Sequence, residues 1–178
     1  MIKKVLTIGA LWWIINFCYA CCEVLPYYLY SSIDISIPAT EISLMDSLII
    51  TIDPTETNFV ANANPSMLRA HALTCTQGEN GAKFPIEYFD IITQQDFDSN
   101  HLEGSSVKNL FRIEYYDKNT YERIDVLLSD LTDLTQLFYN TIYTKDRPSL
   151  NNEIKFRIEL TNSKREEFNS ETAIITWQ

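Results

Sequence analysis

Four side chains able to bind a metal ion or move a proton follow one another closely near the middle of the chain. Asp96, Asp98 and Asn100 alternate along the sequence, and His101 follows directly. This D-x-D-x-N spacing presents oxygen atoms as a calcium-binding loop does. An EF-hand also needs glycine at position 101 and glutamate at position 107, where this chain has His101 and Val107, so that loop type is excluded. Two interpretations stay open: a looser oxygen-ligand site, and an ordered connection whose side chains bind nearby backbone amides.

The same segment contains the residue types of a nucleophilic hydrolase. Asp98, His101 and Ser105 are the acid, base and nucleophile that a catalytic triad requires. The other histidine of the chain, His71, lies at the entry to a predicted strand, where a structural role is more common than a catalytic one. The sequence lacks the G-x-S-x-G elbow, the phosphate-binding P-loop and the H-E-x-x-H zinc motif. A hydrolase is therefore an alternative here, and we expect neither a metal nor a cofactor.

The N-terminal segment has the layout of a secretory signal. Lys3 and Lys4 precede the apolar run Val5–Ile15, and Ala20 supplies a small residue before a cleavage point. A membrane-spanning helix needs about 20 apolar residues, so this run is short for a span. An uncleaved anchor extending through Ala20 is the alternative. We predict a signal peptide over residues 1–20.

The cysteine that follows Ala20 makes this segment resemble a bacterial lipoprotein signal. In that family, a cysteine directly after a small residue receives a diacylglyceryl group and becomes the mature N-terminus. The resemblance implies lipidation of Cys21 with acyl chains such as palmitate, with Cys22 as the alternative; Cys18 stands where the family usually has leucine. Two or more acyl chains make membrane attachment durable. The implied location is the cell envelope, anchored to the outer membrane, with its periplasmic and surface faces both open.

The remaining cysteines allow two interpretations. With Cys21 lipidated, Cys22 and Cys75 can form a disulfide in an oxidising compartment. The favoured interpretation is that Cys75 is a small buried side chain in a strand. Three cysteines in a mature chain of this length do not make a disulfide framework.

Composition and charge limit the class of protein. The 178-residue chain has 46% hydrophobic residues, which is ordinary for a globular core. Its net charge of −10 disfavours nucleic-acid binding, because phosphate contacts need clustered lysine and arginine. We predict a lipid-anchored tether over residues 21–30 and a single domain over residues 31–178.

Strand patterns recur along this domain. In the first of them, Ile33, Ile35 and Ile37 alternate with polar residues, as in a half-buried strand. Residues 55–66 are polar and predicted to be irregular, and 117–120 form the turn of a hairpin. The predicted strands are Leu29–Ile37, Ser43–Ile52, Ala70–Thr76, Ile86–Thr93, Leu110–Tyr116, Tyr121–Leu128, Ile154–Leu160 and Ala173–Trp177.

One segment breaks the strand pattern. Apolar residues between 130 and 143 recur at helical spacing, and Ser129 or Asp130 can cap the start of a helix. The predicted fold is therefore mainly β, an immunoglobulin-like antiparallel β-sandwich with one inserted α-helix at about residues 130–143. The Cys…Trp…Cys signature of antibody domains is absent, so only the architecture is predicted. The apolar positions of this helix are Leu131, Leu134, Leu137, Phe138 and Ile142.

A second resemblance rests on the central motif. The residues that carry it are Asp96-Phe97-Asp98, His101, Gly104-Ser105-Ser106, Leu110-Phe111 and, more loosely, Phe168 with Thr172–Ile175. In these residues the chain is similar to a family of uncharacterised lipoproteins from Gram-negative gut bacteria. That resemblance implies a compact, mostly β envelope domain without an assigned activity, and it implies no catalytic residue.

These observations favour a non-catalytic binding or assembly module, held to the membrane by its lipid and using loops or an exposed sheet edge for recognition. The partner is a glycan or a protein, and nucleic acid is not expected. A small periplasmic hydrolase is one alternative. A glycan-binding accessory lipoprotein is another, because the chain has ten tyrosines. The pairs Tyr115-Tyr116 and Tyr139/Tyr143 are nevertheless more simply explained as strand and helix packing.

Overall fold

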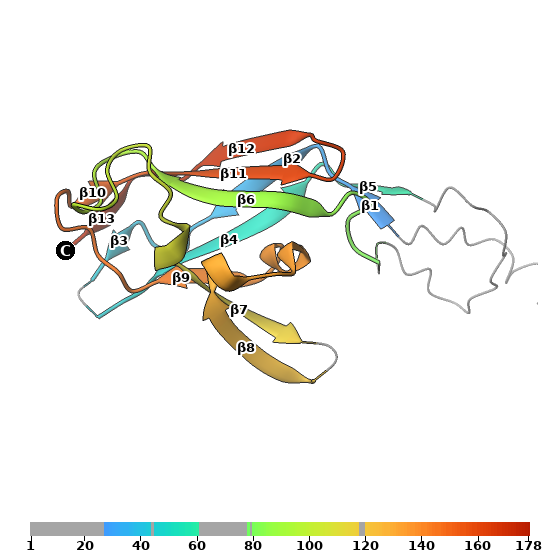
Figure 1. Cartoon of the computed structure of the whole chain (residues 1–178), viewed down its shortest axis with the longest axis horizontal. Helices are drawn as coiled ribbons and strands as arrows, with labels where there is room; N and C mark the ends of the chain where they lie inside the picture. The colour runs from blue at the N-terminus through green and yellow to red at the C-terminus, as the bar shows by residue number, and fades with distance from the viewer. Residues whose placement is uncertain (1–26, 44, 61–77, 79, 118–119) are drawn as a thin grey trace, which may run out of the picture. The chain divides into compact units, whose positions relative to one another are not determined.

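The computed structural model describes residues 27–43, 45–60, 78, 80–117 and 120–178 (Figure 1). The chain divides into two compact units, one formed by residues 1–29 with 58–83 and the other by residues 30–57 with 84–178. Strands dominate, and the described part contains no helix of seven or more residues. None of the helices in those ranges is both apolar enough and long enough to cross a membrane.

In the smaller unit, the described residues form a two-stranded antiparallel ribbon. Strand β1 (Tyr27–Leu29) pairs with β5 (Asn58–Val60), which lies inside the stretch predicted to be irregular. Gly78 has a φ of 75°, and a Cβ atom there would lie 2.9 Å from the Phe59 ring. Only glycine meets both conditions without strain. The predicted strand 70–76 lies outside the described residues.

The larger unit contains a five-stranded antiparallel sheet in the order β2-β4-β9-β7-β8. Strand β4 shows why these residues form strands: Leu48, Ile50 and Ile52 are fully buried, while the residues between them face outward. Period-two burial of this kind requires an extended backbone. The strands are β2 (Ser32–Ser36), β4 (Leu48–Thr55), β7 (Arg112–Asp117), β8 (Glu122–Leu127) and β9 (Thr141–Thr144).

Two three-stranded sheets complete this unit. One is antiparallel, in the order β12-β11-β6, and the other has the order β10-β13-β3, with β13 and β3 parallel. The Arg147 guanidinium donates to the carbonyls of Ser43 and Gln178. These hydrogen bonds hold the residue that follows β3 next to the last residue of the chain. The strands are β3 (Glu41–Ile42), β6 (Ile86–Thr93), β10 (Glu153–Ile154), β11 (Phe156–Asn162), β12 (Glu167–Glu171) and β13 (Ile175–Trp177).

The core of the larger unit lies between these layers, which makes the arrangement sandwich-like. Strands β6, β11 and β12 run alongside β2 and β4 in Figure 1. The fully buried Phe156 of β11 meets Phe111 edge-on, with ring centroids 5.5 Å apart, and lies 6.3 Å from Phe97. Trp177 of β13 packs against the Phe97 ring at 6.4 Å. Aromatic side chains thus connect β11 and β13, from the two three-stranded sheets, with the residue that leads into β7.

The predicted helix at residues 130–143 is wrong. The structure has two short 3-10 turns, η2 (Leu128–Asp130) and η3 (Leu134–Leu137), followed by β9. Leu131, Leu137 and Phe138 still enter the core, so the apolar spacing has a packing origin without a continuous helix. Tyr139 has a φ of 63°, which no α-helix contains. The residues of β9 favour strands, and β9 is hydrogen-bonded between β4 and β7.

Candidate functional site

The loop that contains the residues predicted to do chemistry connects β6 to the 3-10 turn η1 (Lys108–Leu110). It brings Asp98 and His101 together: the ring Nδ1 of His101 lies 2.9 Å from Oδ1 of Asp98. The same Oδ1 atom accepts the backbone N–H groups of Asn100 at 2.7 Å and of His101 at 2.8 Å. The Asp98 carboxylate is therefore occupied in holding the turn closed.

Asp96 serves a different part of the loop. Its Oδ1 accepts the backbone N–H of Glu103 at 2.8 Å, and the Asn151 side chain donates to its carbonyl at 2.8 Å. Phe97 lies between these two acids in the sequence. Its side chain is buried and anchors the loop in the core. Among the described residues, no three His, Cys, Asp or Glu side chains are grouped so as to hold a metal ion. This geometry fits the ordered connection that the sequence left open.

Acid should destabilise the protein through carboxyl groups that are more acidic in the folded state. The His101 hydrogen bond lowers the pKa of Asp98, and the Lys155 hydrogen bond lowers the pKa of Glu171. A lowered folded-state pKa stabilises the protein above the unfolded pKa of about 4, and this stabilisation is lost as the pH falls through the folded-state pKa. We expect the urea midpoint to drop below about pH 4, and to drop less in a D98N/E171Q variant. An equal drop in the variant would exclude these two groups as the cause.

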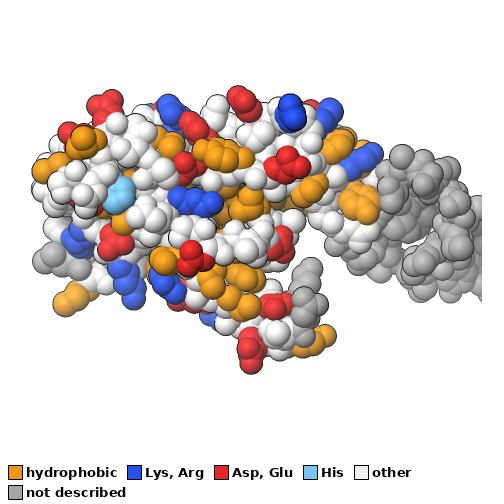
Figure 2. Space-filling model, viewed as in Figure 1, with side chains coloured by type: hydrophobic (Ala, Val, Ile, Leu, Met, Phe, Trp, Pro, Cys, Tyr) orange, Lys and Arg blue, Asp and Glu red, His pale blue; other side chains and the backbone are white. Residues whose placement is uncertain are grey.

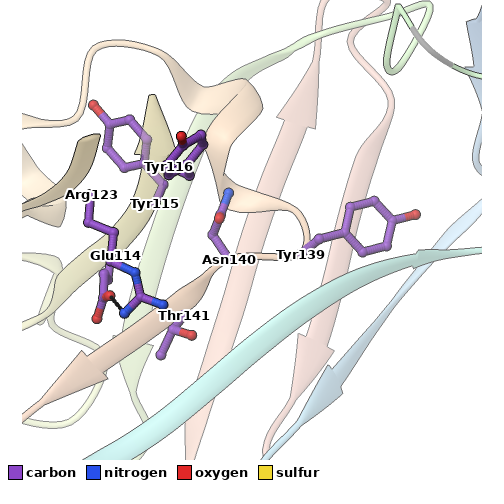
Figure 3. Close-up of a pocket in the computed structure, with 7 residues that line it drawn as sticks. All are labelled: Glu114, Tyr115, Tyr116, Arg123, Tyr139, Asn140 and Thr141. Atoms are coloured by element: carbon purple, nitrogen blue, oxygen red, sulfur yellow. Dashed lines mark hydrogen bonds and ion pairs between the residues drawn. The ribbon is translucent and has the colours of Figure 1, made fainter. Parts of the chain in front are cut away.

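The structure also contains a pocket that the sequence did not indicate. Its volume is about 270 Å³, and it lies over β7, β8 and the residues that lead into β9 (Figure 3). Tyr116 and Tyr139 are 52% and 64% exposed, so a ligand can reach both side chains. In Figure 3 the Asn140 side chain lies between Tyr116 and the start of the Tyr139 side chain, and the Tyr139 ring points away from the other labelled side chains. We call this site the tyrosine pocket; it is lined by Glu114, Tyr115, Tyr116, Arg123, Tyr139, Asn140 and Thr141.

The sheet register explains why these residues meet. Tyr116 is opposite Arg123, and Glu114 is opposite Thr141, so side chains from three strands stand on one face. Arg123 Nη1 donates to Glu114 Oε1 at 2.7 Å, the contact drawn as a dashed line in Figure 3. The paired charges and the Thr141 hydroxyl provide the polar part of the pocket.

Tyr139 is held in place by its backbone. Its φ of 63° is in the left-handed region, which is uncommon for a bulky residue. The N–H of Tyr139 donates to the Ile52 carbonyl at 3.2 Å, and the Asn140 amide donates to the Gln136 carbonyl at 2.7 Å. Partial burial, and then the charge of Asp53, raise the pKa of Tyr139, so its phenol stays protonated at neutral pH and can donate a hydrogen bond.

A second hollow, of about 350 Å³, lies on the neighbouring part of the same sheet and is lined in part by Leu110 and Lys145. Asp125 also lines it and accepts hydrogen bonds from Arg112 Nε at 2.9 Å and from the Tyr143 hydroxyl at 2.8 Å. Burial alone would raise the pKa of Asp125, but these hydrogen bonds lower it overall. Figure 2 shows acidic, basic and hydrophobic side chains interspersed on the β7–β8 hairpin.

The site residues predicted from the sequence are not those of the tyrosine pocket. Cys21, Cys22, Cys75 and His71 lie outside the described residues, so lipidation and the disulfide stay predictions. The tyrosines at 115, 116, 139 and 143 were interpreted as packing residues. The signal that distinguishes Tyr116 is its period-two relation to Glu114, which puts it on the polar face of β7. Tyr139 gives no such signal, because its exposure depends on the backbone turn that precedes β9.

Comparison of the chain with models of known protein families gave no match, and comparison with curated protein sequences gave none either.

Proposed function

We propose that the protein is a non-catalytic binding module of the cell envelope, tethered by a lipid on Cys21 and built on an immunoglobulin-like sandwich. The tyrosine pocket is its recognition site, and its ligand is a carbohydrate. The N-terminal sequence supports the tether, and the exposed aromatic and polar side chains of the pocket support the ligand class.

The chemistry of the pocket suits a polyhydroxylated ligand. The face of a tyrosine ring is apolar and packs on the C–H face of a sugar ring, while its hydroxyl stays available for hydrogen bonding. Beside Tyr116, the pocket adds the amide of Asn140, the Thr141 hydroxyl and the Arg123 guanidinium, and Tyr139 lines it from the side that leads into β9. Its volume of about 270 Å³ is near the lower end of ordinary ligand sites. It therefore fits one unit of a longer glycan better than a fully enclosed small molecule.

One observation carries this proposal: Tyr139 exposes 64% of its surface while its backbone is in the left-handed region. A bulky residue in that conformation costs of order 1–3 kcal/mol, and such strain concentrates at functional sites. An exposed ring contributes little to the core that would offset this cost. Ligand contact gives the ring a role that packing does not.

Alanine at either pocket tyrosine should weaken glycan binding at least tenfold, because buried aromatic anchors contribute about 2 kcal/mol or more at binding sites. A glycan array probed with the full-length protein in detergent identifies the ligand, and calorimetry compares Tyr116→Ala and Tyr139→Ala with wild type. Tyr88→Ala is the matched control, because Tyr88 is 48% exposed but lies on β6. Equal affinities in all four proteins would exclude the tyrosine pocket.

The hydrolase alternative rests on the hydrogen bond between Asp98 and His101, which orients the imidazole as in a triad. We expect Asp98→Ala to lower the urea midpoint more than His101→Ala, because the Asp98 carboxylate also accepts two backbone N–H groups. Glycan binding should survive in both variants. Retained stability combined with loss of a hydrolytic activity would instead favour the enzyme.

A further inference from the structure

The end of the five-stranded sheet is formed by β8, which pairs with β7 on one side and with no strand of the described chain on the other. An open edge of this kind exposes a row of backbone N–H and C=O groups that another strand can bind. Its charged residues are solvent-accessible: the side chains of Arg123 and Asp125 are 81% and 47% exposed. The edge therefore has backbone groups available to a partner, and its two exposed charges, each bridged to a charged group of its own chain, stay accessible from outside.

The hydrogen-bond pattern shows which residues of β8 face outward. The N–H of Leu128 donates to the Phe111 carbonyl at 2.9 Å. Hydrogen-bonded pairs alternate along an antiparallel ladder. Ile124 and Val126 therefore direct their backbone groups toward β7, and Arg123, Asp125 and Leu127 direct theirs outward, although Arg112 also donates to the Asp125 carbonyl at 3.1 Å. That carbonyl keeps a second lone pair for a strand partner.

A second copy of the chain fits this edge in one register. Two identical antiparallel strands related by a two-fold axis at Ile124 place Arg123 opposite Asp125 of the partner subunit, twice. Centring the axis on Asp125 or on Arg123 instead places like charges opposite each other, which is destabilising. Centring it on Val126 shortens the overlap and leaves Arg123 without a charged residue opposite it across the interface. Charge complementarity therefore selects the axis at Ile124.

This register also extends a row of charges that exists within one chain. Glu114 and Asp125 stand directly opposite each other in the β7–β8 pair, and each is bridged to an arginine, Glu114 to Arg123 and Asp125 to Arg112. In the two-fold pair, Arg123 of the partner subunit continues the same row and lies next to Asp125. We infer that two copies of the protein pair through their β8 strands, antiparallel and centred on Ile124, to form one sheet with five strands from each copy. The inference depends on the strand edge alone, and it stands even if the tyrosine pocket binds no glycan.

Single cysteines along β8 test both the pairing and its register. In a non-hydrogen-bonded antiparallel pair the Cα atoms lie about 4.5 Å apart, within disulfide range. Positions 122 and 126 each lie about 14 Å from their own copies, four residues along the strand at about 3.4 Å each. Purified full-length Ile124→Cys should therefore form at least tenfold more cross-linked dimer than wild type, while Glu122→Cys and Val126→Cys stay at the wild-type background. No excess at position 124, or equal cross-linking at all three positions, would overturn the inference.

Charge reversal in the Ile124→Cys background tests the ionic contacts. Arg123→Asp and Asp125→Arg should each abolish the dimer, because each places like charges opposite one another. An equal mixture of the two variants should restore a mixed dimer, since each strand then meets its complement. Restoration shows that both variants are folded, and a dimer that persists in each variant alone contradicts the register. If a variant does not fold, as judged by circular dichroism, the cysteine scan decides the question without it.

Discussion

Replacing Phe156 with alanine should lower the free energy of unfolding by about 3–5 kcal/mol. Phe156 is fully buried, and its ring meets the rings of Phe111 and Phe97 at 5.5 and 6.3 Å. Its loss opens a cavity where β11 packs against the neighbouring layers. Because a whole domain is stable by only about 5–15 kcal/mol, this change removes a large fraction of the stability. Urea unfolding followed by circular dichroism measures the effect.

The matched control is Leu150→Ala, an apolar truncation at a side chain that is 56% exposed. Exposed substitutions usually change stability by less than about 0.5 kcal/mol. A loss below about 1 kcal/mol for Phe156→Ala would mean that this ring is not at the centre of a packed core.

Replacing Cys21 with serine should move the protein from the membrane fraction to the soluble fraction and remove its acyl mass. The effect is expected to be nearly complete, because durable attachment needs two acyl chains and both are linked through this sulfur in the lipoprotein resemblance. Intact-mass analysis and fractionation of expressing cells measure it. Cys22→Ser is the matched control and should stay lipidated. A Cys21→Ser protein that keeps its acyl mass would assign the anchor to another residue.

The strands with strict alternation could be predicted from the sequence. Ile86–Thr93 has the predicted bounds, and Phe156, Ile158 and Leu160 of β11 are buried as their period-two pattern requires. The hairpin of β7 and β8 followed from the polar turn at 117–120. In each case one face is buried and the other is polar, so the local pattern contains the needed information.

The elements that were missed or wrongly predicted do not show this alternation of apolar and polar residues. Strand β12 (Glu167–Glu171) was not predicted, because its sequence is mostly polar and only Phe168 is buried. Its place in the sheet comes from pairing with β11, which is a tertiary effect. The segment 130–143 has apolar residues at helical spacing, yet pairing of β9 with both β4 and β7 outweighs helix formation.

The candidate site could likewise be predicted only where its residues are close together in the sequence. The loop of Asp96–His101 is local in sequence, so its hydrogen-bonded turn was among the predicted interpretations. The tyrosine pocket draws on residues 114–116, 123 and 139–141, which meet only because β9 and β8 flank β7. The hairpin turn relates 114–116 to 123, but no spacing rule relates either segment to 139–141, so the pocket could not be predicted before the strand order was known.

Nuclear magnetic resonance of the full-length protein in detergent, titrated with the glycan that the array identifies, tests the proposed function most directly. We expect chemical-shift changes confined to residues 114–116, 123 and 139–141, with the largest at Tyr116 and Tyr139. Changes centred on the loop that joins β6 to η1, or no saturable change with any glycan, would contradict it.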